Sequence, residues 1–311
     1  MADLPKRTLG RTGLEVTTLG YGAMELRGAP RGRDVTEEQA ERILNAVLDA
    51  GINFIDTSID YGLAEERIGR YISHRRSEYF LASKCGCLAG DLAQNTAPVP
   101  PEQRNPHRFT PENIVQGVNQ SLARMKTEYL DLVQFHHSPS RAQLEEHGGL
   151  EALQALQRQG KVRYIGVSGT LPNLAEQIEM GVFDTFQIPY SALERAHETL
   201  IEQASRAGAG IIIRGGAAKG GPGKEQGDFW AAWQRVGIDD LLNGMSRMEF
   251  ILRFTYTNPD LDTTIVGTIN PDHLQGNVNA LLAGPLPADV YDEAKRRLAE
   301  AGSAPVTIPA T

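Results

Sequence analysis

The stretch INFIDTSIDYG at residues 52–62 is the best guide to the fold, because an apolar strand pattern runs directly into reactive polar side chains. Asp56 and Tyr61 follow the end of that apolar run. Two later stretches repeat the design, YFLASK (79–84) ending on Lys84 and LDLVQFH (130–136) ending on His136. In a barrel of parallel strands, catalytic groups lie at the C-terminal ends of different strands and converge in space. A phenol, an ammonium, a carboxylate and an imidazole that meet there indicate proton transfer.

Outward from this stretch, short β-prone runs alternate with amphipathic helix patterns, and eight strand–helix units can be counted. The strands are nearly continuous apolar runs, which is typical of a parallel sheet buried on both faces. We therefore predict an α/β fold, a (β/α)8 TIM barrel with an N-terminal β-hairpin and additional helices, formed as one domain by residues 1–311. An open doubly wound sheet is the alternative fold, although no G-x-G-x-x-G follows any strand.

Three segments carry specific local predictions. Residues 8–20, TLGRTGLEVTTLG, predict a hairpin that plugs one end of the barrel and leads into its first strand. Residues 36–50 predict a helix with a capping box of Thr36 and Gln39, a stop at Gly51, and a buried face of Ala40, Ile43, Leu44, Val47 and Leu48. A further helix is predicted with Thr110 as its cap, Pro111 in its first turn, and a buried stripe of Ile114, Val115, Val118, Leu122 and Met125.

Composition and charge exclude several classes of protein. Hydrophobic residues make up 41% of the chain and charged residues 23%, which is ordinary for a globular domain with a sizeable core. The formal net charge of -8 opposes binding to nucleic acid or to an anionic membrane surface. The N-terminal sequence lacks the apolar core of a signal peptide, and no run is long enough to span a membrane. We expect a cytoplasmic protein.

The two cysteines, Cys85 and Cys87, directly follow Lys84. A disulfide that closes so tight a loop would be strained, so both are expected to be reduced thiols. A metal site would need further ligands at a suitable spacing, and His107 is the sole nearby candidate. We therefore predict no metal site.

These stretches together resemble a known family. INFIDTSIDYG, LASK, YLDLVQFH, VRYIGVSG and FDTFQIPYS occur in the order and at the separations seen in aldo-keto reductases. The resemblance extends from about Thr8 to Leu282. It implies a (β/α)8 barrel that binds a nicotinamide cofactor in extended form, without a Rossmann fold, and reduces carbonyl groups with it.

Proton transfer can be argued from the residues themselves. Hydride transfer to a carbonyl leaves an alkoxide that must be protonated, and a tyrosine with a pKa near 10 is a weak donor unless an ammonium stabilises its phenolate. Tyr61 and Lys84 form that expected pair, Asp56 neutralises the buried lysine, and His136 orients the carbonyl oxygen. Taken alone, each residue has a simpler structural explanation. Tyr61 could be a loop aromatic and Lys84 a solvated strand end. Asp56 could cap a turn and His136 could be a structural histidine. Strand alternation places His137 opposite His136.

The resemblance implies the cofactor contacts. It places Ser168 and Gln187 near the nicotinamide amide, and an asparagine commonly follows that serine where this chain has Gly169. Arg214 stands where an aromatic often stacks on the nicotinamide, although a strand-end arginine in solvent is the simpler reading. The diphosphate is expected on the Gly-rich loop that begins with Gly215 and Gly216, and on the segment GTINPDHLQGN. In that segment the resemblance aligns five residues with cofactor-contacting positions: Gly267, Thr268, Asn270, His273 and Asn277.

NADP(H) is expected in preference to NAD(H). Family members often carry an arginine or lysine for the 2'-phosphate where this chain has Ile269 and His273, while Lys219 and Lys224 offer compensating charge. The predicted activity is NAD(P)H-dependent reduction of a small-molecule carbonyl or sugar. Oxidation of an aldose or alcohol is an alternative, and so is a cofactor-binding regulatory subunit that resembles potassium-channel β subunits.

The expected pocket wall lies between segments far apart in the sequence. It comprises Met24 after the first strand, the segment 86–109 with Arg104, His107 and Arg108, and the loop 216–245. A long stretch without regular structure inside a compact domain is usually functional. Trp230 and Trp233 are equally consistent with the pocket and with packing between helices.

Overall fold

Eight parallel strands form a closed barrel in the computed structural model, which describes residues 3–90, 107–217 and 228–307. The strands follow one another around the ring in chain order: β3 (Leu19–Gly22), β4 (Phe54–Asp56), β5 (Phe80–Cys85), β6 (Leu130–Phe135), β7 (Val162–Ser168), β8 (Thr185–Pro189), β9 (Gly210–Arg214) and β10 (Thr263–Val266). Pairing of β10 with β3 closes the ring. The predicted barrel is therefore confirmed, and the open sheet is excluded.

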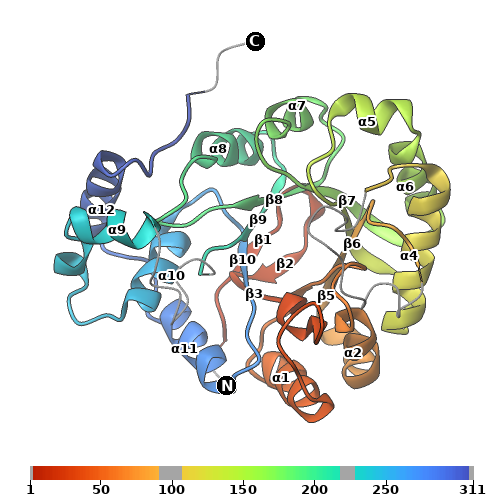
Figure 1. Ribbon diagram of the computed structural model, residues 1–311, viewed down its shortest axis with the longest axis horizontal. Coiled ribbons are helices and arrows are strands. Elements are labelled where there is room, and N and C mark those ends of the chain that lie inside the picture. Colours follow the sequence, from red (N-terminus) through yellow and green to blue (C-terminus); the bar gives the residue numbers. More distant parts are fainter. Residues whose placement is uncertain (1–2, 91–106, 218–227, 308–311) are drawn as a thin grey trace.

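Helices surround the strands on all sides (Figure 1). In chain order they are α1 (Glu37–Asp49), α2 (Ala64–Tyr71), α4 (Pro111–Met125), α5 (Arg141–Glu146), α6 (Gly149–Arg158), α7 (Leu174–Glu179), α8 (Glu198–Arg206), α9 (Asp228–Arg235), α10 (Arg247–Thr257), α11 (Pro271–Leu282) and α12 (Ala288–Glu300). The last of these is an extra helix beyond the repeat, joined to the rest by a hydrogen bond from Arg297 Nη1 to the carbonyl of Gly237 (2.8 Å).

The predicted hairpin plugs the end of the barrel where the strands begin. Its strands, β1 (Lys6–Thr8) and β2 (Glu15–Thr17), pair antiparallel. Leu9, Leu14 and Val16 are buried in one cluster with barrel-interior residues of four strands: Phe54, Ala82, Leu132 and Ile212. Gly10 has φ 45°, and a Cβ added to it would lie 2.2 Å from the backbone nitrogen of Gly210, so this close approach requires glycine. The apolar floor of the barrel is thus complete.

The structure confirms one of the two predicted buried helix stripes in full and the other only in part. In α1 the capping box of Thr36 and Gln39 forms, and all five predicted residues are buried. In α4 Thr110 is at the N-cap without a side-chain hydrogen bond, and Val115 is 37% exposed, so its placement in the stripe was wrong. Gly117 and Ser121 are buried instead. The helix approaches α2 closely, since a Cβ on Gly69 would lie 2.0 Å from the carbonyl oxygen of Arg124, and small residues are needed on such a face.

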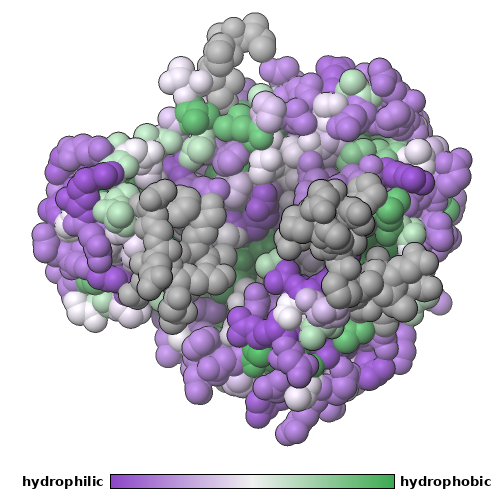
Figure 2. All heavy atoms as spheres, viewed as in Figure 1, coloured by the Kyte–Doolittle hydropathy of each residue, from purple (hydrophilic) through white to green (hydrophobic). Residues whose placement is uncertain are grey.

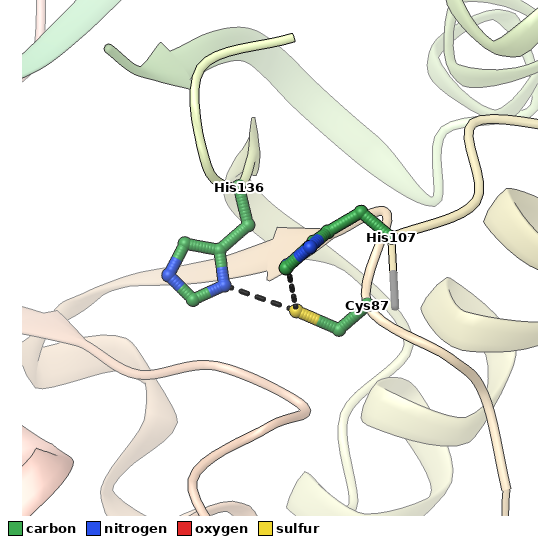
Figure 3. A group of neighbouring side chains, drawn as sticks. All are labelled: Cys87, His107 and His136. Atoms are coloured by element: carbon green, nitrogen blue, oxygen red, sulfur yellow. Dashed lines mark hydrogen bonds between the residues drawn. The ribbon is translucent and has the colours of Figure 1, made fainter. Parts of the chain in front are cut away.

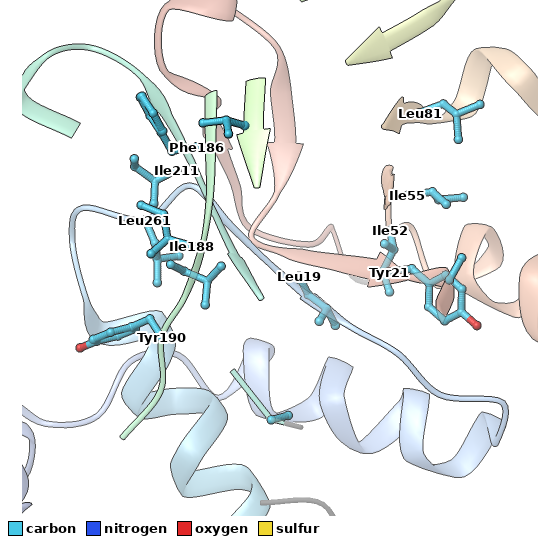
Figure 4. Close-up of a cluster of buried hydrophobic side chains, with 14 of the residues drawn as sticks. Leu19, Tyr21, Ile52, Ile55, Leu81, Phe186, Ile188, Tyr190, Ile211 and Leu261 are labelled. Atoms are coloured by element: carbon cyan, nitrogen blue, oxygen red, sulfur yellow. The ribbon is translucent and has the colours of Figure 1, made fainter. Parts of the chain in front are cut away.

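The main core lies between the barrel and the helices. Strand residues of the outward parity, such as Leu19, Tyr21, Ile55, Leu81 and Ile211, are buried there together with residues of the helices and loops (Figure 4). On the face shown in Figure 2 the described surface is mostly hydrophilic, with apolar residues in small scattered groups. Among the described residues, no helix has both the length and the apolar character to cross a membrane.

Candidate active site

The barrel interior changes from apolar to polar along each of several strands. Successive inward positions are two residues apart. In four strands an apolar floor residue is followed by a polar one, as Phe54 by Asp56, Ala82 by Lys84, Leu132 by Gln134 and Ile212 by Arg214. This alternation explains why the predicted polar residues converge: they form the next layer above the plug, toward the C-terminal ends of the strands.

A buried ion pair lies at the centre of this layer. Lys84 Nζ donates hydrogen bonds to Asp56 Oδ2 (2.6 Å) and to the carbonyl of Thr57 (2.8 Å). The other carboxylate oxygen accepts from the amides of Gln134 (3.0 Å) and Gln187 (2.8 Å). The side chains of Lys84 and Asp56 are 0% and 1% exposed. Burial opposes the charged amine, but Asp56 and Tyr61 outweigh it and raise the pKa of Lys84, so the lysine is an ammonium.

Tyr61 is delivered to Lys84 by the turn that follows β4. Its backbone N–H donates to the carbonyl of Ser58 (2.9 Å), and Lys84 Nζ lies 5.0 Å from the centre of its ring. The Tyr61 side chain is partly buried and packs against the main core. Burial raises the pKa of Tyr61, outweighing the charge of Lys84. The phenol is thus a proton donor held in its neutral form, next to a cation ready to stabilise the phenolate.

His136 is brought to the same site at the end of β6. Its ring centre is 6.1 Å from that of Tyr61, with the planes nearly perpendicular. Burial, aided by the charge of Lys84, lowers the pKa of His136 well below the usual range, so the imidazole is neutral. The prediction that His137 points to the opposite side was wrong, since the two rings are 4.2 Å apart. The strand ends at Phe135 and His137 has φ 63°, so strand alternation no longer applies there.

Cys87 and His107 complete the surroundings of His136, as Figure 3 shows. Cys87 Sγ lies 3.0 Å from His136 Nδ1 and 3.4 Å from His107 Nε2. Both cysteines are unpaired thiols, as predicted, and burial raises the pKa of Cys87 well above its usual value. A thiol that keeps its proton can donate it to His136 Nδ1, which would leave the other ring nitrogen protonated. That nitrogen lies on the opposite edge of the ring (Figure 3).

The residues expected near the nicotinamide amide join the central network. Ser168 Oγ donates to Gln187 Oε1 (3.2 Å), whose amide group in turn binds Asp56. Gly169 is packed closely, because an added Cβ would lie 2.7 Å from Gln177 Oε1 and 2.8 Å from Leu174 Cδ1. An asparagine at this position would require the Leu174 and Gln177 side chains of α7 to move.

Arg214 ends β9 with its side chain largely inside the barrel. Burial lowers the pKa of Arg214, while Tyr61, Glu194 and Asp56 act in the opposite direction, which places the guanidinium near these groups. Its Nε is buried without a hydrogen-bond partner among the described residues. Gly215 follows with φ 75° and open space at its Cβ position, whereas a Cβ on Gly216 would meet Thr264 Oγ1 at 2.8 Å. The loop from residue 218, including Lys219 and Lys224, lies outside the described residues.

The segment after β10 carries the remaining predicted contacts. A Cβ on Gly267 would lie 2.6 Å from the carbonyl oxygen of Gly22, and the carbonyl of Thr268 accepts from Tyr21 Oη (2.8 Å). Asn270 caps α11 through a hydrogen bond to its oxygen from the Asp272 N–H (2.9 Å). His273 is exposed in the first turn and Asn277 is buried one turn later. Gly267, where two backbone segments lie close together, and the N-terminus of α11 are therefore neighbours. Such a helix N-terminus suits the phosphate of a dinucleotide.

Three expected wall residues can be compared with the structure. Trp230 and Trp233 are buried and contact each other, and Trp233 also packs edge-on against Phe250 and donates to Asp239 Oδ1 (2.8 Å). They pack between α9 and α10, which decides the question left open by the sequence. Met24 is 40% exposed. Residues 91–106, with Arg104, lie outside the described residues.

Sequence reasoning missed two members of the site. Gln134 binds the Asp56 carboxylate, and its position two residues before His136 in the run LDLVQFH could have revealed it. For Cys87 the sequence offers only His107 as a nearby ligand, because the contact with His136 depends on the meeting of two strand ends. Asp60, paired with Arg31 (2.7 Å), also lies near His136 and His137.

Comparison with known proteins agrees with this geometry. The model of the Aldo/keto reductase family matches residues 18–226. The uncharacterised oxidoreductase YrpG of Bacillus subtilis is 30% identical over 307 residues, covering 88% of this chain and 90% of its own. L-galactose dehydrogenase of Arabidopsis thaliana is 25% identical over 309 residues, with 90% and 89% covered.

Among solved structures, an aldo-keto reductase of Bacillus halodurans in its holo form superimposes with a TM-score of 0.83 at 26% identity. The match covers 97% of this chain and 98% of that one. These matches extend over the barrel and include the strands that carry Asp56, Lys84 and His136. The chain therefore belongs to the aldo/keto reductase family of NAD(P)-dependent oxidoreductases.

Proposed function

We propose that this protein reduces an aldehyde or ketone to an alcohol with NAD(P)H, using Tyr61 as the proton donor. The observation that carries the proposal is the buried ammonium of Lys84, held between Asp56 Oδ2 (2.6 Å) and the carbonyl of Thr57 (2.8 Å) beside the phenol. A buried lysine that only stabilised the fold would need no tyrosine as a further partner. Here the cation is fixed where negative charge develops on the phenol oxygen, which favours proton release in the transition state.

The proton leaves the Tyr61 oxygen for the carbonyl oxygen of the substrate. Lys84 stabilises the resulting phenolate, and Asp56 keeps Lys84 charged throughout. His136 is neutral, and its ring nitrogen opposite Cys87 donates a hydrogen bond to the same carbonyl oxygen. The apolar floor below excludes water from the proton path, which strengthens each of these interactions.

The described residues fit a nicotinamide cofactor. The buried Arg214 Nε without a partner, the glycine approach at Gly267 and the capped N-terminus of α11 provide surfaces for a planar ring and for phosphates. When bound, the cofactor supplies the hydride. Ser168 and Gln187 would hold its amide, and Arg214 would lie against its ring. We propose NADP(H) in preference to NAD(H), with the exposed His273 at the helix N-terminus as a donor to the additional phosphate.

The direct experiment is to follow oxidation of NADPH, and separately of NADH, with a panel of aldehydes, ketones and sugars. The proposal expects turnover with at least one carbonyl, and a loss of about 10²- to 10⁴-fold in Tyr61→Phe. Binding of the cofactor should survive that substitution, because only the hydroxyl is removed. Turnover that is equal in Tyr61→Phe would contradict the assigned donor, and cofactor binding without any turnover would favour the regulatory alternative.

Oxidation of a sugar or other alcohol is the second candidate. It is favoured by the similarity to a plant relative whose name assigns it L-galactose dehydrogenase activity, over 90% of this chain. The same residues serve the reverse reaction, with the Tyr61 phenolate as the base. Because burial raises the pKa of Tyr61, the phenol is protonated at neutral pH, and this favours reduction. Measuring both directions at one pH with the same substrate pair decides between them.

A further inference from the structure

Three potential metal ligands from separate segments meet beside the proposed catalytic histidine. Cys87 follows β5, His107 precedes α4, and His136 follows β6. Their donor atoms, Cys87 Sγ, His107 Nε2 and His136 Nδ1, all lie within 4.8 Å of one another. Figure 3 shows both imidazole rings presenting a nitrogen to the same sulfur. The sequence placed only Cys87 and His107 near each other, and the fold adds the third donor.

We propose that Cys87, His107 and His136 form a binding site for a divalent transition metal of the zinc type. One thiolate and two imidazoles are ligands that Zn²⁺ prefers, and three protein ligands with one open position are a recurring arrangement. The proposed reductase chemistry needs no metal, and it shares only His136 with this site.

The spacing of the donors suits this assignment. Typical Zn–S and Zn–N bonds at a tetrahedral angle place sulfur about 3.6 Å from nitrogen. The separations here, 3.0 Å to His136 and 3.4 Å to His107, are shorter than that value by about 0.6 and 0.2 Å. Small side-chain rotations therefore suffice to admit an ion, which displaces the thiol proton of Cys87 as it binds.

Charges of both signs act on the cluster: the cations Lys84 and Arg214 act on His136, and an acidic group acts on the other two ligands. Asp60 lies near enough to act electrostatically on both Cys87 and His107, and it is the acidic member of a second donor group with His136 and His137. That second group contains no sulfur, and its carboxylate already pairs with Arg31 at 2.7 Å. The cysteine-containing group is therefore the stronger site for a thiophilic ion, with Asp60 adding negative charge nearby.

A bound ion would inhibit the enzyme. It would hold His136 through Nδ1 and bring a divalent charge toward Lys84 and Arg214, so that His136 could no longer adjust to the carbonyl oxygen. This consequence rests on the proposed function, whereas binding itself does not, and the two can be measured separately.

Binding is tested with the untagged full-length protein and Co²⁺ as a spectroscopic substitute for zinc. We expect one Co²⁺ per chain, intense tetrahedral d–d absorption, a thiolate-to-cobalt charge-transfer band in the near ultraviolet, and displacement of both by Zn²⁺. Cys87→Ser should abolish the charge-transfer band and weaken binding about 100-fold, and His107→Asn should weaken it at least about tenfold. Cys85→Ser is the matched control, because Cys85 is an equally buried thiol outside the donor group.

Circular dichroism confirms that each variant is folded, and the His107 variant tests the site independently if the Cys87 variant is not. Absence of binding at micromolar Co²⁺ would overturn the proposal. So would binding without the charge-transfer band, or binding unchanged in Cys87→Ser, since either places the ion on other donors. Inhibition is read separately, as the ratio of turnover with and without Zn²⁺ for each variant. An active enzyme that binds cobalt through Cys87 but is not inhibited would refute only the inhibitory role.

Discussion

Replacing Lys84 by methionine tests the buried ion pair most directly, because it removes the charge and keeps much of the side-chain volume. Both partners are inaccessible to solvent, at 0% and 1% exposure. The variant leaves the Asp56 carboxylate inside the barrel with only the amide donors of Gln134 and Gln187. Loss of one partner of a buried ion pair lowers stability by about 3–5 kcal/mol.

Proton uptake by the carboxyl group limits this loss. At pH 7, protonating a carboxyl group with an ordinary pKa near 3.9 costs about 4 kcal/mol. We therefore expect Lys84→Met to lower the free energy of unfolding by about 3–4 kcal/mol at pH 7. Once the carboxyl is neutral in the folded variant and ionised in the unfolded chain, a fall in pH favours the folded form. The deficit should then shrink by about 1.4 kcal/mol for each pH unit.

Urea unfolding of the native chain and the variant at pH 7, 6 and 5 measures this trend. The double variant Asp56→Asn/Lys84→Met removes the stranded charge and should recover most of the stability without recovering turnover. Turnover of Lys84→Met should fall about 10²- to 10⁴-fold, while cofactor affinity stays within about tenfold. Unchanged turnover would refute the proton-transfer scheme. A pH-independent deficit that the second substitution does not relieve would refute the ion-pair argument.

Three further predictions concern the same site. The rate of reduction should be independent of pH from about 6 to 9, because Tyr61, with its raised pKa, stays protonated and His136, with its lowered pKa, is already neutral. The rate of oxidation should rise with pH over the same range. A titration near pH 6.5 in kcat/KM would contradict the neutral histidine. Arg214→Ala should weaken cofactor binding by about 1–2 kcal/mol and Arg214→Tyr should restore it, as followed by nicotinamide fluorescence; equal binding by all three proteins would exclude stacking. Gly169→Asn should lower the free energy of unfolding by about 1–3 kcal/mol, because the asparagine side chain would clash with Leu174 and Gln177. A variant that is more stable and binds the cofactor more tightly would show that α7 leaves space for an asparagine side chain.

The barrel and its polar layer were predictable because both follow from periodicity. Apolar runs that end in Asp56, Lys84 and His136 specify parallel strands whose ends meet, and the structure brings these residues together with Tyr61. The same two-residue period could have added Gln134. It misled the prediction at His137, where a left-handed residue after the strand turns the ring back.

Features that depend on packing between distant elements could not be derived in this way. Val115 suits the apolar stripe of α4, yet it is exposed, while Gly117 lies against Ile59 and Ser121 lies near Glu65 of α2 on the buried face. The contact of Cys87 with His136 arises only when the ends of β5 and β6 meet. Trp233 could line a pocket or a helix interface until α10 supplied Phe250 as its neighbour.

The hairpin plug gives the barrel only one open end. Leu9, Leu14 and Val16 seal the floor, so a molecule cannot thread through the ring from one side to the other. If the proposed function holds, substrate and product would enter and leave from the C-terminal ends of the strands, above Tyr61 and Lys84. A molecule bound nearer the rim would therefore hinder the departure of one bound beneath it.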